Sequence, residues 1–257
     1  DRSTVSDQAN KPNERSPGRS RATLYATISI LALVCAAVPA QAFDRYTAHG
    51  GPVRDLTISP DGSMLVSASF DYSAVVWTAP QITEKSVLYA HEAAVNTARF
   101  SPDGTLLATA GDDGRIYLWK KGVLASEDPE PIILTGHKGK VVNLAFSDDG
   151  SLLASASWDG SVGLWPLDGG LESAAADSRF IFGHDGPVNM VQFAPNGTHL
   201  YSAGYDGQIR YWKLSNGEYL RSVVRNGWSV SVMSVDEASD MIAFGSSDGT
   251  MNIERLS

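Results

Sequence analysis

The chain has 257 residues, of which 43% are hydrophobic and 19% charged, values typical of a globular protein and unlike those of disordered or fibrous chains. Its formal net charge of −9 would repel a phosphate backbone or an anionic membrane surface unless the chain carried a basic stripe, which the sequence lacks, so we expect no nucleic-acid partner. The single cysteine, Cys35, excludes a disulfide within the chain.

The first distinct segment, residues 19–42, has the three parts of a secretory signal peptide. Arg19 and Arg21 supply positive charge, residues 22–38 are apolar, and Ala40-Gln41-Ala42 is a small-x-small cleavage site. We therefore expect export, with a periplasmic location and no stable membrane anchor after cleavage. A retained transmembrane helix is the alternative, but an apolar stretch of about 17 residues is marginal for spanning a bilayer.

Residues 1–18, which precede this signal, are polar and contain proline, and the chain begins with Asp1 rather than Met. We interpret them as a disordered or mis-started leader.

From residue 43 onward the chain repeats itself. Each of four histidines is followed 22 residues later by an aspartate and, six residues after that, by a tryptophan. The histidines are spaced by 42, 46 and 47 residues: His49, His91, His137 and His184. A fifth unit follows in register at Asp248, but it has Asn226 in place of the histidine and Glu254 in place of the tryptophan.

The units cover about residues 43–90, 91–136, 137–183, 184–225 and 226–257. The third unit shows the pattern that all share, in which short apolar or alternating runs are separated by Asp-Gly turns. Its expected strands are Val141–Phe146, Leu152–Ser157, Ser161–Trp165 and Phe180–Phe182. Four short antiparallel strands in each unit of this length predict the blades of a β-propeller, an all-β fold.

The motifs within the units resemble those of the WD40-repeat family. Ser-Pro-Asp-Gly stands at Ser59–Gly62 and Ser101–Gly104, and Gly-His stands at Gly136-His137 and Gly183-His184. The resemblance covers about residues 43–257 and implies a WD40 β-propeller. Because such propellers usually have seven blades, we expect four complete blades and a partial fifth, belonging to a truncated seven-blade propeller. Closure as a five-blade ring, with Phe43–Ala48 adding a fourth strand to the last blade, stays open.

The same resemblance implies that each complete unit contains a structural tetrad of His, Ser or Thr, Asp and Trp joined by hydrogen bonds. Such a chain satisfies buried polar groups that would otherwise each cost about 1–3 kcal/mol. We therefore interpret these residues as structural and expect no metal site and no cofactor in this chain. The fifth unit, which lacks two of the partners, should be looser. The tetrads are His49, Ser67, Asp71 and Trp77; His91, Thr109, Asp113 and Trp119; His137, Ser155, Asp159 and Trp165; and His184, Ser202, Asp206 and Trp212.

Catalytic signatures are absent from the sequence. It has no Gly-x-Ser-x-Gly nucleophile elbow, no His-Glu-x-x-His zinc helix and no glycine-rich phosphate loop. We expect a non-catalytic protein.

By resemblance, ligands of WD40 propellers meet the top face, where the residue before each turn aspartate points. Three of these five residues are aromatic, and large aromatic side chains with an arginine are the usual anchors of a protein interface. We hypothesise a peptide- or protein-binding surface there, although the aromatic rings could instead pack only against neighbouring blades. Its residues are Phe70, Trp158, Tyr205, Arg54, Asn96, Asp112, Lys140 and Asn189.

The predicted function is therefore that of an exported interaction scaffold. The alternative comes from the run His49–Val53, which resembles the start of exported bacterial propellers fused to a c-type cytochrome. In that case the chain would be the propeller portion of an electron-transfer protein. The Cys-x-x-Cys-His haem site that this requires is absent from the chain, so a haem domain would have to lie outside it.

Overall fold

A computed structural model describes residues 46–126 and 128–256 of the chain. The expected leader and signal peptide, residues 1–42, lie outside the described residues. From Ala48 onward the chain forms one compact unit.

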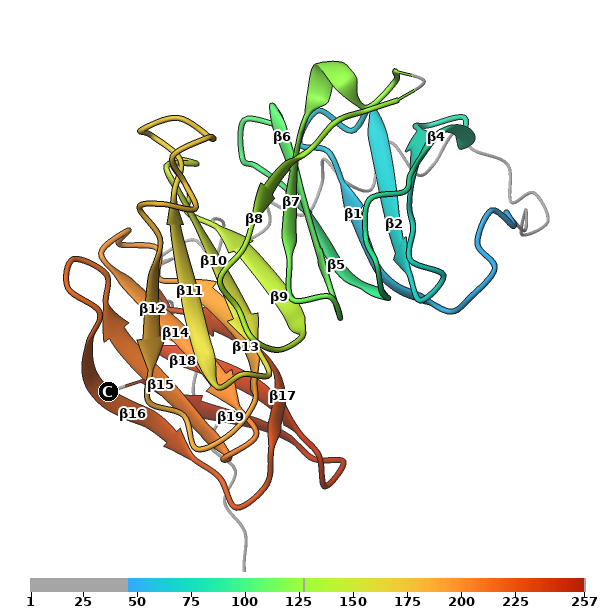
Figure 1. Ribbon diagram of the computed structural model, residues 1–257. Coiled ribbons are helices and arrows are strands. Elements are labelled where there is room, and N and C mark those ends of the chain that lie inside the picture. The colour runs from blue at the N-terminus through green and yellow to red at the C-terminus, as the bar shows by residue number, and fades with distance from the viewer. Residues whose placement is uncertain (1–45, 127, 257) are drawn as a thin grey trace, which may run out of the picture. The chain divides into compact units, whose positions relative to one another are not determined.

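The described strands form five antiparallel sheets in chain order (Figure 1). Each sheet consists of strands that are consecutive in the sequence, and the first four sheets have four strands while the fifth has three. They are β1 Val53–Ile58, β2 Met64–Ser69, β3 Ala74–Thr78 and β4 Thr83–Leu88; β5 Val95–Phe100, β6 Leu106–Gly111, β7 Ile116–Lys120 and β8 Ile132–Leu134; β9 Val141–Phe146, β10 Leu152–Ser157, β11 Ser161–Pro166 and β12 Arg179–Phe182; β13 Val188–Phe193, β14 His199–Gly204, β15 Gln208–Lys213 and β16 Glu218–Arg225; and β17 Val230–Asp236, β18 Met241–Ser246 and β19 Met251–Arg255.

These sheets confirm the prediction of an all-β propeller fold. In the third blade the first two strands have the expected bounds, while β11 extends by one residue to Pro166 and β12 begins one residue earlier, at Arg179. Pro166 can end a strand because it pairs with Leu152 at the limit of the ladder, where a missing N–H costs little.

The Ser-Pro-Asp-Gly turns explain how the first strand of a blade passes to the second. Ser59 Oγ donates to Asp61 Oδ1 at 2.7 Å and accepts from the amide of Met64 at 2.9 Å. Gly62 has a φ of +68°, which glycine adopts at no steric cost. The same hydroxyl-to-aspartate bond recurs at Ser101–Asp103 and Ser147–Asp149.

In the described part of the chain the hydrophobic core consists of four clusters, each between two sheets that are consecutive in the chain. Between the first two sheets, for example, Val66 and Val76 pack with Leu107 and Trp119. This arrangement follows from the period-2 alternation of the strands, which gives each sheet one face for the preceding blade and one for the next. No cluster in residues 46–126 and 128–256 joins the fifth sheet to the first.

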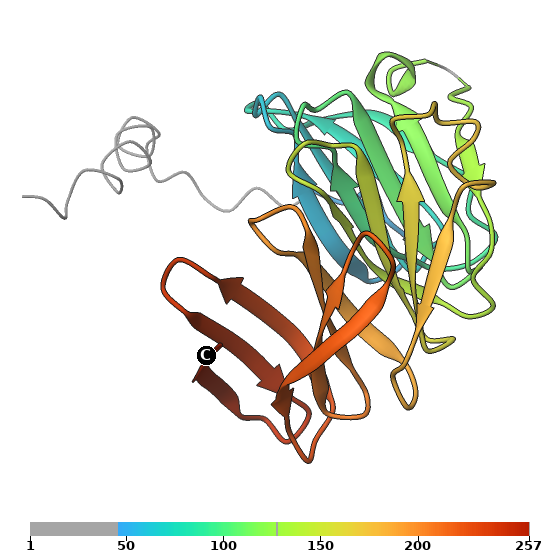
Figure 2. The same cartoon turned by 90° about the vertical axis from the view of Figure 1, so that its left-hand side faces the viewer.

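The closing strand that the sequence allows at Phe43–Ala48 falls partly outside the described residues. Its described part, residues 46–48, has no strand structure, and β17, β18 and β19 form a sheet without a fourth strand. Figure 2 shows these three red strands side by side, next to the orange sheet of the fourth blade.

No helix in the described part of the chain is long and apolar enough to cross a membrane.

Candidate interaction surface

Each complete blade contains a chain of side-chain hydrogen bonds that ties its loops to its strands. In the third blade, His137 Nδ1 lies 2.9 Å from Asp159 Oδ2, and His137 Nε2 lies 2.7 Å from Ser155 Oγ. The indole N–H of Trp165 donates to the same Ser155 Oγ at 2.8 Å. These four residues come from a loop, two strands and a hairpin turn. Their hydrogen bonds therefore connect parts of the blade that are up to 28 residues apart in sequence.

The direction of each hydrogen bond in this chain follows from the charge states. Burial lowers the pKa of His137 and outweighs the opposing effect of Asp159, so the imidazole stays neutral. Burial alone would raise the pKa of Asp159, but hydrogen bonds from Ser161, the Lys138 amide and His137 lower it to about 2. An ionised carboxylate only accepts, so His137 Nδ1 donates to Asp159 and Nε2 accepts from the Ser155 hydroxyl.

The first, second and fourth blades repeat this geometry. The histidine Nδ1 lies 2.9–3.0 Å from the aspartate in all three: His49–Asp71, His91–Asp113 and His184–Asp206. The histidine Nε2 lies 2.7–2.9 Å from the hydroxyl oxygen: His49–Ser67, His91–Thr109 and His184–Ser202. The indole N–H donates to that oxygen at 2.7–3.1 Å: Trp77–Ser67, Trp119–Thr109 and Trp212–Ser202.

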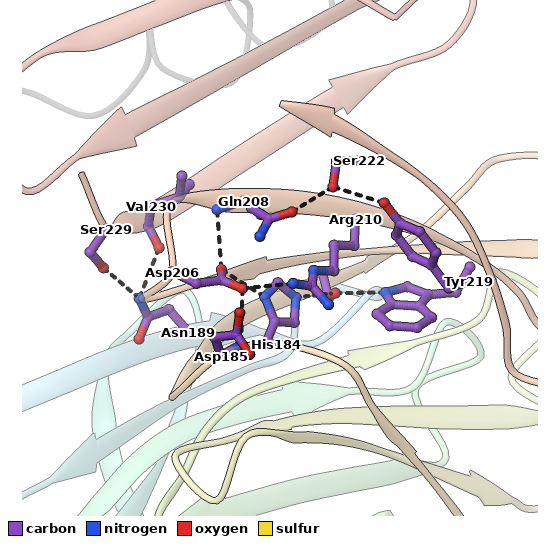
Figure 3. A network of polar contacts seen from close by, with 12 residues as sticks. His184, Asp185, Asn189, Asp206, Gln208, Arg210, Tyr219, Ser222, Ser229 and Val230 are labelled. Carbon is purple, nitrogen blue, oxygen red and sulfur yellow. Dashed lines mark hydrogen bonds and ion pairs between the residues drawn. The ribbon is translucent and has the colours of Figure 1, made fainter. Parts of the chain in front are cut away.

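The fourth blade adds a largely buried arginine side chain to this hydrogen-bond network (Figure 3). A guanidinium nitrogen of Arg210 lies 3.0 Å from Asp206 Oδ2, and its Cζ lies 5.8 Å from the centre of the Tyr219 ring. The sequence reasoning missed this residue. The signal was present, because the equivalent positions, four residues after the aspartate, hold Val75, Tyr117 and Gly163, and an arginine there is the single charge among uncharged residues.

The fifth blade replaces the chain with shorter contacts. Asn226, in the histidine position, donates through Nδ2 to Ser246 Oγ. Asp248 binds within its own turn, where it accepts from the amide and the hydroxyl of Thr250 at 3.0 and 2.7 Å. Among the described residues, the hydrogen bonds of the Asp248 side chain stay within its own turn and do not connect that turn to the loop before β17.

The residues before the turn aspartates occupy equivalent places in all five blades. In each blade the amide of this residue donates to the carbonyl of the residue immediately before the first strand, at 2.8–3.0 Å: Phe70–Pro52, Asp112–Ala94, Trp158–Lys140, Tyr205–Pro187 and Ser247–Ser229. The three aromatic side chains are between 41% and 66% exposed. We call the eight residues that the sequence places here the aromatic face: Arg54, Phe70, Asn96, Asp112, Lys140, Trp158, Asn189 and Tyr205.

Four residues of the aromatic face form one chain across the second and third blades. Asn96 Nδ2 donates to Asp112 Oδ1 at 2.8 Å and to the carbonyl of Val141 at 3.1 Å. The ammonium group of Lys140 pairs with Asp112 Oδ2 and lies 5.4 Å from the centre of the Trp158 ring. Trp158 is thus held beside a cation that is itself anchored to the neighbouring blade.

The other four residues lie apart from this chain. Arg54 stands over the ring of Phe70 in the first blade, with 4.9 Å between Cζ and the ring centre. Asn189 turns toward the fifth blade, where its Nδ2 donates to the carbonyl of Val230 at 2.8 Å and to Ser229 Oγ at 3.2 Å. Asn189 therefore joins the fourth blade to the fifth, and its role as a contact residue stays a prediction. Tyr205 is the most exposed of the three aromatic residues.

Comparison with protein families decides what these repeats are. A family model described as "WD domain, G-beta repeat" matches residues 41–78, 82–120, 130–166 and 177–213. The chain belongs to the WD40 repeat family. No curated protein matches the chain. The four matched segments end before the fifth blade, which agrees with the loss of the histidine and tryptophan there.

Two exposed aromatic residues of the WD40 unit were not found from the sequence. Tyr72 follows the turn aspartate at the position where the other blades have Gly114, Gly160, Gly207 and Gly249, and it has a φ of +72°. Trp228 lies two residues after Asn226, outside the positions that the repeat pattern singles out, and is exposed. A tyrosine at a glycine position is a readable signal, whereas nothing in the repeat spacing points to Trp228.

The WD40 tetrads lie on different blades, so the histidines and aspartates of different tetrads are not expected to bind one metal ion together. In residues 46–126 and 128–256, no three His, Cys, Asp or Glu side chains converge as a metal ion would require.

The neutral state of the tetrad histidines predicts how the stability of the fold depends on pH. Burial lowers the pKa of His137 and His184 below 6.5 in the folded chain. Below pH 6.5 the unfolded chain therefore binds protons that the folded chain does not, and stability falls as the pH falls. We expect the melting temperature to decrease between about pH 7.5 and 5.5, and to decrease less in the double variant His137→Gln/His184→Gln.

The matched control for this measurement is His199→Gln, because His199 lies outside the tetrads, stacked on Tyr211. The melting temperature of the variant His199→Gln should depend on pH in the same way as that of the unmodified chain. Equal pH dependence in the double variant and the unmodified chain would show that the two histidines do not titrate on unfolding.

Proposed function

We propose that this WD40 chain is an exported, non-catalytic scaffold that binds a peptide or protein through its aromatic face. WD40 repeats generally mediate protein interactions, and their propellers are typically non-catalytic. The observation that carries the proposal is the set of exposed aromatic rings at equivalent places on the first, third and fourth blades, two of them paired with cations.

The energetics of this surface favour protein recognition. Large aromatic residues and arginine supply most of the binding energy in protein interfaces, because their rings bury much apolar area with few rotatable bonds. Trp158 is 49% exposed and Lys140 lies beside its ring. The link from Lys140 through Asp112 to Asn96 limits the motion of the ammonium group, so less conformational entropy is lost when a partner binds.

Backbone strain at Tyr72 supports the same surface. A non-glycine residue at φ near +72° costs about 1 kcal/mol or more, and such strain gathers at functional sites. The exposed Tyr72 is two residues after Phe70, whose ring Arg54 covers. We infer that its ring contributes to binding at the expense of stability.

The expected export depends on the segment 19–42, outside the described residues. N-terminal sequencing of the protein recovered from its native compartment tests it. Export predicts a mature chain that begins at Phe43.

The binding test starts from peptides selected by display on the immobilised full chain. We expect the selected peptides to lose at least about tenfold in affinity, or 1.4 kcal/mol, for the double variant Trp158→Ala/Tyr205→Ala. The matched control is Phe182→Ala, which removes an exposed aromatic ring from the outer strand β12. Unchanged affinity for the double variant, or an equal loss in the control, would contradict the proposal.

Tyr72→Gly gives a separate prediction, in which stability and binding change in opposite directions. Glycine relieves the positive φ without steric cost, so the variant should melt at the same temperature as the unmodified chain or above it. The selected peptides should bind it more weakly. Lower stability together with unchanged binding would mean that the ring packs within the blade and has no role in recognition.

A further inference from the structure

Three asparagines of the chain are followed by glycine, and the structure places the three pairs in different surroundings. An asparagine in this position is chemically labile, because glycine has no Cβ to hinder attack of its backbone nitrogen on the side-chain amide carbon. The sequence by itself therefore offers three equivalent sites of deamidation. The pairs are Asn196-Gly197, Asn216-Gly217 and Asn226-Gly227.

In the first two pairs the glycine amide is held within a tight turn. The amide of Gly197 donates to the carbonyl of Ala194 at 3.0 Å, and the glycine has a φ of +65°. The amide of Gly217 donates to the carbonyl of Lys213 at 2.9 Å, and its φ is +71°. Each nitrogen must give up a hydrogen bond before it can attack.

The asparagine side chains of these two pairs are held as well. Asn196 Oδ1 accepts from the amide and the hydroxyl of Thr198 at 2.9 and 2.8 Å. Asn216 Oδ1 accepts from the amide of Glu218 at 3.1 Å. Each asparagine is therefore part of a closed turn, which has to open before the glycine nitrogen can reach the side-chain carbon.

The third glycine lacks these restraints. Gly227 is exposed in the loop between β16 and β17, and its amide donates to no acceptor in residues 46–126 and 128–256. A Cβ at this position would meet nothing within 4 Å, so the space around the glycine is open. The nitrogen of Gly227 is therefore free to attack without the loss of a hydrogen bond.

The free amide of Gly227 is a consequence of the lost tetrad. In the four complete blades the residue after the histidine donates its amide to the tetrad aspartate at 2.7–3.2 Å: Gly50–Asp71, Glu92–Asp113, Lys138–Asp159 and Asp185–Asp206. In the fifth blade the equivalent carboxylate is that of Asp248, which accepts from Thr250 within its own turn. The loop before β17 therefore keeps an amide that the other blades use.

The side chain of Asn226 is positioned by the nitrogen that would leave. Its Nδ2 donates to Ser246 Oγ, and its backbone amide donates to the carbonyl of Gly207 at 2.7 Å. The Ser246 hydroxyl thus lies beside the nitrogen that must take up a proton to depart as ammonia.

We propose that Asn226 is a site of spontaneous deamidation in the folded chain, in preference to Asn196 and Asn216. The nitrogen of Gly227 forms a bond to Asn226 Cγ and loses its proton, while the Cγ–Nδ2 bond breaks and ammonia leaves. The product is a cyclic succinimide. Solvent water then opens the ring at either of its two C–N bonds, which gives aspartate or isoaspartate.

Both products change the loop that carries Trp228. Aspartate places an ionised carboxylate where the amide of Asn226 donates to Ser246, so the serine hydroxyl must become the donor. Isoaspartate adds a CH₂ group to the main chain next to Gly227, at the point where the carbonyl of Asn226 packs against Gly207. Either product adds a negative charge two residues before the exposed Trp228.

The test follows all three asparagines in one sample of the full chain, kept folded at mildly alkaline pH and sampled over days. Peptide mass spectrometry measures the fraction of each asparagine that has become an acid, and enzymatic methylation of isoaspartate measures the second product. We expect Asn226 to convert about three- to tenfold faster than Asn196 and Asn216, the factor that corresponds to one amide hydrogen bond. The variant Gly227→Ala, for which the loop has room, should slow conversion at Asn226 alone.

The matched control is the same measurement in concentrated urea. All three asparagines precede glycine, so their rates should converge once the turns of the folded chain are lost. Conversion at Asn226 that is absent, or no faster than at the other two asparagines in the folded chain, would overturn the proposal. A preference for Asn226 that persists unchanged in urea would also overturn it, because that preference would come from the neighbouring sequence and not from the fold.

Discussion

Asp159→Ala should lower the free energy of unfolding by about 1–3 kcal/mol. The change removes the acceptor of four hydrogen bonds, those from His137 Nδ1, the Lys138 amide, the Ser161 amide and the Ser161 hydroxyl. The side chain of His137 is buried, so its Nδ1 donor would lose its ionised acceptor and keep only the Ser161 hydroxyl oxygen, at 3.2 Å. Urea denaturation followed by tryptophan fluorescence measures the effect.

Asp248→Ala is the matched control for this prediction. Asp248 is the equivalent residue of the fifth blade, but it accepts only from Thr250 in its own exposed turn. We expect its urea midpoint to stay near that of the unmodified chain. Similar shifts in the two variants would show that the turn, and not the connection to the histidine, gives Asp159 its importance. The stabilisation by Asp159 also depends on pH. Hydrogen bonds lower the pKa of its carboxyl group to about 2, so they stabilise the fold above about pH 4, and this stabilisation is lost as the pH falls below that value.

Gly207→Ala should destabilise the chain even more, by about 3 kcal/mol or more. Gly207 has a φ of +74°, which an alanine adopts at a cost of about 1–2 kcal/mol. A Cβ at this position would also lie 2.0 Å from the carbonyl oxygen of Asn226 and 2.9 Å from that of Trp228. Both oxygens are backbone atoms of the loop between β16 and β17, so relief requires that loop to move and break the bond from the Asn226 amide to the Gly207 carbonyl.

Gly249→Ala separates these two causes. Gly249 is the equivalent glycine of the fifth blade, with a φ of +86°, and a Cβ there would meet nothing within 4 Å. This variant should show the conformational cost of about 1–2 kcal/mol alone. Hydrogen exchange of the β16–β17 loop adds a local measurement, and we expect faster exchange in Gly207→Ala only. Equal losses in both variants would mean that the loop adapts without cost.

If the aromatic face binds a partner, Trp158 and Tyr205 should contribute to binding in different ways. Trp158 belongs to a chain of contacts that spans two blades and includes Asn96, Asp112 and Lys140. Tyr205 projects from the fourth blade, and Asn189, expected beside it, joins that blade to the fifth. A partner would therefore find rigid anchors over the second and third blades and a more adaptable aromatic ring at the fourth.

The repeat unit was readable from the sequence because its determinants are local to a blade. The histidine, the hydroxyl residue, the aspartate and the tryptophan must keep a fixed spacing for their hydrogen bonds to form, and variation in length gathers between the tryptophan and the next histidine. The strands followed from the alternation of apolar residues and from turns such as Ser59–Gly62. Even the weak fifth blade was visible, because Asp248 and Gly249 still keep the register of the turn.

The tertiary structure alone decided what lies between blades. Three contacts join residues whose relative positions depend on how one sheet packs on the next: the hydrogen bond from the Ala98 amide to Asp55, the pair Lys140–Asp112 and the hydrogen bond from Asn189 to the Val230 carbonyl. No local pattern encodes that packing, since the spacing between units varies and the partner of each side chain belongs to another unit. For the same reason the sequence showed Leu56 and Met251 as ordinary apolar strand residues, and only the packed sheets showed that both side chains are exposed.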